Sequence, residues 1–366
     1  MEARQCLRTL AQINGGGGGK RRWKQGGDEP RRRKRRMLVA PAVEVDHFDS
    51  LPDDIIVTVL SKLSSSANRP QDLFSAFLTC KRFHVLGNHS LVLSKANARC
   101  LAVRVKAWSE AAHGFLQRCV DCGNIEACFI LGMIRFYALG NRGSGASLMA
   151  KAAIRSHPWS LYSLAIIQFN GSGGSKNAKD LRAGVALSAR AAFFGHVDAL
   201  RELGHCLQDG YGVRRNVNEG RRFLLQANTR ELVSAIASLP AWKNGPHRRA
   251  TTEGIAEAAA AAAAGGSPLL SDFGWNLPPP EPHPANRFLV DWFQSSPTRL
   301  PEDLRLCSQR NCGRPETRRH EFRRCSVCGV VSYCSRACQA LDWRLSHKAE
   351  CVPPAIFVAD VAAGTD

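Results

Sequence analysis

The spacing of apolar residues predicts that most of this chain is helical. From residue 48 to about residue 92, apolar side chains recur three and four positions apart, which places them on one face of a helix. A polar turn over residues 64–70 divides this stretch, and a third apolar segment follows at Lys81–Leu86. We therefore expect a small unit of three helices. The first two carry the apolar positions Ile55, Ile56, Val59, Leu60 and Leu63, and then Leu73, Phe74, Phe77 and Leu78.

A longer, alanine-rich helical region follows, from residue 95 to about residue 230, and it repeats. Three similar helices start at Leu131-Gly132, Leu164-Ala165 and Leu203-Gly204, which are 33 and then 39 residues apart. Small residues at fixed positions allow paired helices to pack closely, and helix pairs at this period indicate an α-solenoid. Such an array is either a surface for a partner protein or a stiff spacer, and the pattern leaves both readings open.

Other regions lack this periodicity. Residues 1–46 contain a glycine run and two basic clusters, and we expect them to be disordered. Residues 238–298 are expected to form a linker, with an alanine-dominated run at Ala256–Ala264 and an extended proline arm at Leu277–Pro284. Within it, a short helix near Phe288–Phe293 should pack on the folded parts. Residues 354–366 are expected to be a tail.

The formal net charge of the chain is +19, and residues 20–36 alone contain ten Lys or Arg. Two short basic clusters with a polar spacer indicate a nuclear import signal or, alternatively, a solvated tail. We expect the nucleus as the main compartment and the cytoplasm as the second. Direct nucleic-acid binding is disfavoured, because no basic recognition helix follows the clusters. No membrane span is expected, since a run of about 18 apolar residues is missing from the sequence.

The clearest chemistry lies between positions 307 and 351. Seven of the chain's 14 Cys fall in these 45 residues, and His347 lies among them at a ligand spacing. Thiolate and imidazole groups at such spacings are the usual ligands of structural zinc, and their number suits two tetrahedral ions. Zinc with all positions filled by protein activates no water. A helix expected over residues 335–348 would place Cys334 with Cys338, and His347 with Cys351, on shared faces.

The ligand order, and the run from Tyr333-Cys334 to Trp343, resemble the MYND zinc finger. The resemblance implies interleaved binding of two Zn²⁺ ions. It assigns Cys307, Cys312, Cys334 and Cys338 to one ion, and Cys325, Cys328, His347 and Cys351 to the other. It also implies that Gln339 and Trp343 contact proline-containing peptides. The alternative is that Trp343 only packs over the zinc knuckles.

The three-helix unit resembles an F-box in Leu51-Pro52, Ile55-Ile56, Leu60 and Cys80–Phe83. The resemblance implies docking onto the Skp adaptor, and through it the cullin core, of a Skp–cullin–F-box ubiquitin ligase. We expect this contact to be apolar and to use Leu51, Pro52, Ile55 and Leu60. The alternative is that these helices only cap the solenoid.

The repeats resemble the Sel-like branch of the tetratricopeptide-type repeats, in Ala127–Gly132, Ala199–Gly204 and the Gly210–Val213 loop. The whole arrangement resembles a plant family of F-box proteins with a C-terminal MYND finger. The implied fold class is mainly α, with a small two-zinc finger. The implied order is a disordered basic tail (1–46), F-box helices (47–94), a Sel-like solenoid (95–237), a linker (238–298), the finger (299–353) and a tail (354–366).

These expectations favour an adaptor without catalytic activity of its own. Its F-box helices would bind the ligase core, and its repeats and finger would recruit a substrate protein whose identity the sequence does not reveal. The second candidate is a nuclear scaffold or transcriptional co-regulator that binds proline-containing peptides through the finger. An enzyme is disfavoured, because the sequence has no Gly-rich phosphate loop after a strand and no G-x-S-x-G elbow.

Overall fold

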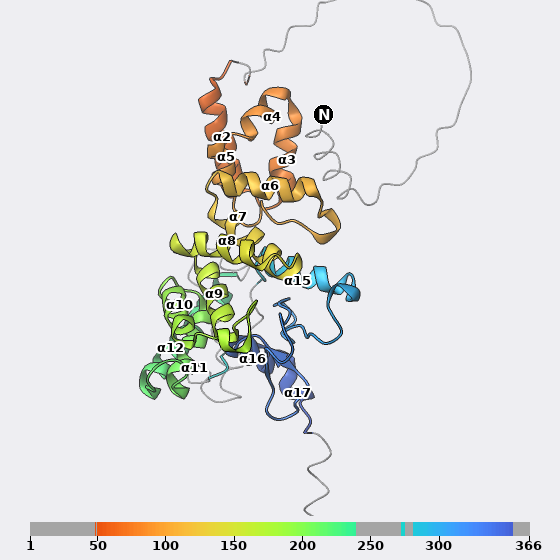
Figure 1. The fold of residues 1–366 in the computed structure, drawn as a ribbon. Coiled ribbons are helices and arrows are strands. Elements are labelled where there is room, and N and C mark those ends of the chain that lie inside the picture. The colour runs from red at the N-terminus through yellow and green to blue at the C-terminus, as the bar shows by residue number, and fades with distance from the viewer. Residues whose placement is uncertain (1–47, 49, 239–271, 275–280, 354–366) are drawn as a thin grey trace, which may run out of the picture.

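The computed structural model describes residues 48, 50–238, 272–274 and 281–353 (Figure 1). This part of the chain is mainly helical, as predicted, and its sheet has two short strands. None of the described helices is long and apolar enough to cross a membrane. The basic tail, the alanine run, the first half of the proline arm (residues 277–280) and the C-terminal tail lie outside the described residues, so expectations about them stay predictions.

The predicted three-helix unit is present, with a fourth short helix after it. Its helices are α2 (Asp53–Ser66), α3 (Pro70–Thr79), α4 (Lys81–Gly87) and α5 (Ser90–Ser94). Ile56 and Leu60 of α2 share a core with Leu73 and Phe77 of α3, and each is at most 3% exposed. The inward face of α2 is therefore the one that carries Ile56 and Leu60.

The repeats form stacked helix pairs, preceded by α6 (Glu110–Asp121) (Figure 1). The helices that begin each pair start 33 and then 39 residues apart, which confirms the predicted period. Each starts six residues before the expected dipeptide, so Leu131-Gly132 and its equivalents lie inside helices. The first helices are α7 (Ile125–Met133), α9 (Pro158–Asn170) and α11 (Val197–Asp209), and the second helices are α8 (Arg142–Ile154), α10 (Leu181–Phe193) and α12 (Val217–Ser238).

A side chain caps the start of each first helix. Asn124, His157 and His196 accept hydrogen bonds of 2.9, 3.3 and 3.3 Å from the backbone N–H group three residues later. Such a bond satisfies one of the free N–H groups at a helix N-terminus. Burial lowers the pKa of His196 to about 3, which keeps its ring neutral and able to accept this bond. The two histidines thus have a structural role that recurs with the repeat.

Glycines bring the two helices of a pair close together. A Cβ atom at Gly145 of α8 would lie 2.6 Å from the backbone nitrogen of Phe136 and 2.7 Å from the carbonyl oxygen of Gly132 in α7. The contact recurs between α11 and α12, where a Cβ atom at Gly220 would lie 2.7 Å from the carbonyl oxygen of Gly204. The expectation that small residues permit close pairing is therefore confirmed at these crossings.

Later parts of the chain cover the first helices of the repeats. The helix α15 (Pro284–Gln294) contacts α7 and the π-helical turn Ile134–Ala138 that follows it. Its Phe288, Leu289 and Phe293 are buried in one core with helices α2, α3 and α5 and the first repeat, which confirms the short helix expected there. The cysteine-rich C-terminal module shares a second core with α9 and α11. The repeats are therefore joined to both neighbouring modules by buried apolar side chains.

We predict that Gly145→Ala lowers the free energy of unfolding by about 1–3 kcal/mol, because the added methyl group would collide with backbone atoms of α7 and the turn after it. The matched control is Gly143→Ala in the same helix, where a Cβ atom meets nothing within 4 Å. Urea unfolding followed by far-UV circular dichroism measures both. Equal midpoints for the two variants would contradict the close crossing.

Candidate metal centre and docking surface

Short elements of the C-terminal module position its cysteines. Strand β1 (Arg323–Arg324) pairs antiparallel with β2 (Ser332–Tyr333), and this hairpin places Cys325 and Cys328 at its turn. The helix α16 (Arg336–Asp342) continues through a π-helical turn (Trp343–His347) into α17 (Lys348–Glu350). A continuous helical stretch across these residues is what the sequence predicted.

The structure brings the eight candidate ligands into two groups of four. Within each group, the ligand atoms all lie within 4.8 Å of one another. The groups are Cys307, Cys312, Cys334 and Cys338, and Cys325, Cys328, His347 and Cys351. This is the interleaved division that the MYND resemblance implied.

The spacing of the ligand atoms suits zinc. The Sγ atoms of Cys312 and Cys334, and of Cys334 and Cys338, are 3.6 Å apart, and those of Cys325 and Cys351 are 3.8 Å apart. A tetrahedral ion with Zn–S bonds of about 2.3 Å holds its sulfur ligands about 3.8 Å apart, whereas a disulfide needs about 2.05 Å. Donor type, number and spacing together fit two closed structural zinc sites, which would supply folding free energy and no reaction chemistry.

Two of the ligand thiols, those of Cys325 and Cys312, have a lowered pKa that favours the thiolate a metal requires. Burial acts to raise the pKa of Cys325, but hydrogen bonds from the Cys328 backbone and from His347 lower it to about 6. A hydrogen bond from Cys307 is the main cause that lowers the pKa of Cys312 well below its usual value. Burial acts the other way on Cys307 and raises its pKa well above the ordinary range. Zinc binding would therefore displace protons from part of each group, and zinc affinity should fall in acid.

A buried arginine lies beside the first group. Arg314 is only 4% exposed, and its Nη1 atom donates to the Sγ atom of Cys312 at 3.5 Å. Burial disfavours its charge, but the thiolates of Cys312 and Cys334 hold the pKa of the guanidinium above its usual value. Four thiolates around one Zn²⁺ leave a net charge of about −2, so a buried cation beside them is electrostatically matched. This arrangement is a further sign that the first group carries an anionic metal site.

The first group also lies at the interface with the repeats. Cys307, Cys312 and Cys334 belong to the core that contains the inward residues of α9 and α11. Arg314 donates from Nη2 to the hydroxyl of Ser163 in α9 at 2.8 Å, and Asn170 at the end of α9 donates to the carbonyl oxygen of Cys334 at 2.8 Å. A zinc ion here would fix the geometry of the finger and of its contact with the repeats at once.

The second group is peripheral to that core. Cys325, Cys328 and His347 are buried, but the loop between the hairpin strands carries the exposed residues Val327 and Val330. The ring of Trp343 lies 5.7 Å from the ring of His347 and 6.3 Å from that of Phe273. Trp343 thus packs beside the second group, as the alternative reading expected. Peptide contact by Gln339 and Trp343 stays a prediction.

The F-box helices expose an apolar strip on α2, and it differs from the expected one. Ile55 is 45% exposed, Pro52 is exposed and Leu51 is partly exposed. Leu60, however, is 2% exposed and part of the core, so it lacks the exposure that was expected of a docking residue. It lies four positions after the buried Ile56, which puts both on the inward face. Val59, four positions after Ile55 and 49% exposed, takes its place.

An arginine orders the segment that leads into this strip. Arg82 of α4 forms an ion pair with Asp53 at 2.6 Å and donates to the carbonyl oxygen of Phe48 at 3.0 Å. It also donates to the carbonyl oxygen of Leu51. The ring of Phe48 lies 5.8 Å from that of Phe83 in α4. Arg82 lies in the Cys80–Phe83 part of the F-box pattern, but its bonds to this segment could not be predicted from that pattern.

The remaining C-x-x-C pair, Cys119 and Cys122, lies at the end of α6. Cys119 is fully buried, and burial raises the pKa of its thiol. A buried, protonated thiol has the character of a core residue and not of a redox group.

Comparison with known proteins finds a matching family model for each of the three modules. Family models match at residues 48–95 (F-box-like), 101–194 (plant tetratrico peptide repeats) and 307–351 (MYND finger). The chain is 61% identical to F-box protein At1g67340 of Arabidopsis thaliana over 84% of its own length and 81% of the relative's. It is 56% identical to F-box protein At5g50450 of the same plant, over 87% and 88% of the two lengths. The chain belongs to this family of plant F-box proteins. The resemblance drawn from its motifs is thereby confirmed.

Solved structures of repeat proteins align with parts of this F-box protein. A Sel1 repeat protein from Oxalobacter formigenes aligns over 31% of the chain and 86% of its own, with 22% identity and a TM-score of 0.29. The protective antigen c5321 of uropathogenic Escherichia coli, which displays an SLR fold, aligns over 68% and 46%, with 15% identity and a TM-score of 0.36. At these scores the alignments support no further conclusion.

We predict that Arg314→Met destabilises the protein by about 3 kcal/mol or more, because it leaves the thiolate group without its buried counter-charge and Ser163 without its partner. The control is Arg319→Met, which removes an exposed ion pair with Asp303 and should leave stability nearly unchanged, because solvent screens such pairs. Denaturant unfolding of the zinc-loaded variants gives both values. A small effect at Arg314 would show that the charge match does not matter.

Proposed function

We propose that this F-box protein is a substrate-recruiting adaptor of a Skp–cullin–F-box ubiquitin ligase. The observation that carries the proposal is the exposed strip of Leu51, Pro52, Ile55 and Val59, which lies within the segment matched by the F-box model. The Skp adaptor, and the cullin core bound to it, are the implied partners on this side. Ubiquitin transfer would be performed by the attached ligase components, so the chain needs no catalytic group of its own.

The strip has the physical character of a docking surface. Ile55 and Val59 are one helical turn apart and point the same way, while Ile56 and Leu60 of the same helix fill the core. The fold therefore does not need the outward residues. Apolar side chains that are exposed together on a braced helix mark an interaction site. A partner would bury them without disturbing the core of the unit.

The rest of the chain supports a rigid connection between ligase and substrate. Phe74 of α3 contacts Phe115 of α6 at 5.1 Å between ring centres, and Trp108 contacts Phe288 of α15 at 5.2 Å. These contacts join the F-box helices, the first repeat and α15 in one core. The F-box helices and the finger lie at opposite ends of the molecule (Figure 1). A substrate bound away from the F-box would keep a fixed position relative to the ligase.

A nuclear scaffold that binds proline-containing peptides through the finger is the second candidate. Gln339 and Trp343 are only half-buried, which favours it. The contact of Phe273 with Trp343 disfavours it, because a segment of the chain already lies against that ring. Both functions suit the nuclear localisation that we propose from the basic clusters. Imaging of a variant with the cluster at residues 31–36 neutralised tests that localisation.

We predict that Ile55→Asp/Val59→Asp abolishes capture of a purified Skp adaptor, since two charges would have to be desolvated in an apolar contact. The control is Ile154→Asp on α8, which is 78% exposed and lies outside the strip. Pull-down with zinc-loaded, full-length protein reports the result, and circular dichroism checks the fold. Undiminished capture by the double variant, or no capture by the unaltered protein, would contradict the proposal.

A further inference from the structure

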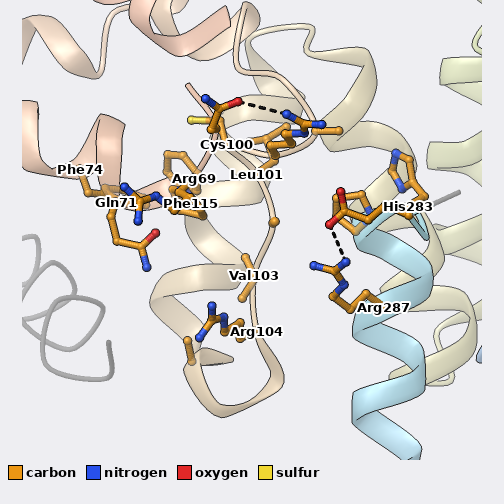
Figure 2. A pocket seen from close by; sticks show the side chains of 18 of the residues that line it. Arg69, Gln71, Phe74, Cys100, Leu101, Val103, Arg104, Phe115, His283 and Arg287 are labelled. Atoms are coloured by element: carbon orange, nitrogen blue, oxygen red, sulfur yellow. Dashed lines mark hydrogen bonds and ion pairs between the residues drawn. The ribbon is translucent and has the colours of Figure 1, made fainter. Parts of the chain in front are cut away.

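A cavity of about 640 Å³ lies between the F-box helices and the start of α15 (Figure 2). One wall is formed by α3 and by residues 98–104, which begin in a turn over residues 98–101, and the opposite wall by residues 281–291. Figure 2 shows Phe74 and Val103 on the first side and Arg287 on the second. The cavity is therefore built from parts of the chain that are far apart in sequence, and it is separate from the strip on α2.

Positive charge predominates in its lining. Four arginines, Arg69, Arg99, Arg104 and Arg287, face two carboxylates, Glu281 and Asp291. The difference between four and two leaves an excess of two positive charges. Arg287 is paired with Glu281 at 2.7 Å, whereas Arg99 donates only to the neutral amide of Asn68 at 3.1 Å.

Two of the arginines are available to an outside anion. The guanidinium of Arg104 has no hydrogen bond or ion pair within the described part of the chain. Arg69 has only an exposed ion pair with Asp72 at 3.4 Å, which contributes little. A carboxylate that entered the cavity could pair with either group in place of water.

The floor of the cavity is apolar. Phe74, Phe115 and Trp159 line it, and Leu78 at its edge is 51% exposed. These side chains could bury one apolar group of a ligand, which fixes register in a way that charge alone does not. The lining thus combines an apolar anchor point with a basic rim.

At Arg104 the backbone of this wall is extended, and the residue before it offers hydrogen-bonding groups. Arg104 has φ −84° and ψ 148°, which are β-region angles. The N–H and C=O groups of Val103 have no hydrogen-bond partner among the residues that the structure describes. An extended peptide can pair with such a segment as an added strand, and its alternate side chains then enter the neighbouring cavity.

We propose that this cavity, named here the α3–α15 groove, binds an extended acidic peptide with an apolar anchor residue, supplied by the substrate. The inference rests on the proposed adaptor function and specifies the class of segment that is recruited. Charge complementarity favours the acidic side chains, and the apolar floor favours the anchor. Nucleic acid fits less well, because an excess of two charges is small for a phosphate chain and the Val103 backbone pairs with a peptide.

Fluorescence anisotropy with the full-length, zinc-loaded protein tests this. The probe is a labelled peptide in which Asp and Glu residues flank a single Leu. The control probe is the same peptide with Asn and Gln in place of Asp and Glu. At near-physiological salt, we expect the acidic probe to bind at least about tenfold more tightly. Equal affinity for the two probes, or tighter binding of a single-stranded oligonucleotide, would overturn the inference.

Single substitutions inside and outside the groove test whether the acidic probe binds there. Arg104→Glu should weaken binding of the acidic probe at least about fivefold, and Leu78→Ser should weaken it to a smaller extent. Arg190→Glu on α10 carries the same charge change at an exposed position outside the groove and should bind like the unaltered protein. If Arg190→Glu and Arg104→Glu weaken binding equally, the attraction is non-specific and the groove is not the site.

The same preparations separate this inference from the proposed function. Arg104→Glu should still capture the Skp adaptor, because Arg104 lies outside the strip on α2. Capture of the adaptor without preference for the acidic probe overturns only the groove. Selective probe binding without capture of the adaptor overturns the ligase role and leaves the groove as a peptide site.

Discussion

The structure depends on the packing of a zinc-binding module against the first helices of the repeats. Residues of the first ligand group belong to the same core as the inward side chains of α9 and α11. Arg314 links the two sides, since one end of its guanidinium contacts a ligand thiol and the other contacts Ser163 of α9. A buried guanidinium is costly unless its charge is matched, so this contact requires the anionic site beside it.

This packing decides which faces of the repeats are open to a partner protein. An array of helix pairs usually presents a long continuous surface, and the sequence left open whether a partner protein or nothing would cover it. Here the chain itself covers the first helices, with α15 over α7 and the finger over α9 and α11. Two surfaces that stay available are the strip at the start of α2 and the α3–α15 groove.

Local features could be predicted from the sequence. The repeat period, the zinc ligands and the F-box core were identified because each depends on spacing within a short segment. The orientation of α2 could not be settled in this way. Ile55, Ile56, Val59 and Leu60 are all apolar, and periodicity alone does not say which pair faces inward. Only packing against Leu73 and Phe77 of α3 decides it, and this placed Val59 outside and Leu60 inside.

Contacts between segments that are far apart in the sequence also could not be predicted. The groove joins residues near position 100 to residues near position 285, and the Arg314–Ser163 bond spans 151 positions. Neither contact could be predicted from the local sequence pattern, because the charged and apolar residues of each segment are ordinary when that segment is considered by itself. The sequence shows that Arg314 stands two residues after the candidate ligand Cys312, but its burial and its bond to Ser163 are visible only in the structure.

Hydrogen exchange measured by mass spectrometry, with and without zinc, tests the central claim most directly. If the finger and the repeats share one metal-dependent core, removing zinc with a chelator should accelerate exchange in α9 and α11 as well as in the finger. The F-box helices α2 and α3, which lie in the other core, should keep more of their protection. Repeats that stay fully protected while the zinc-free finger unfolds would contradict the account.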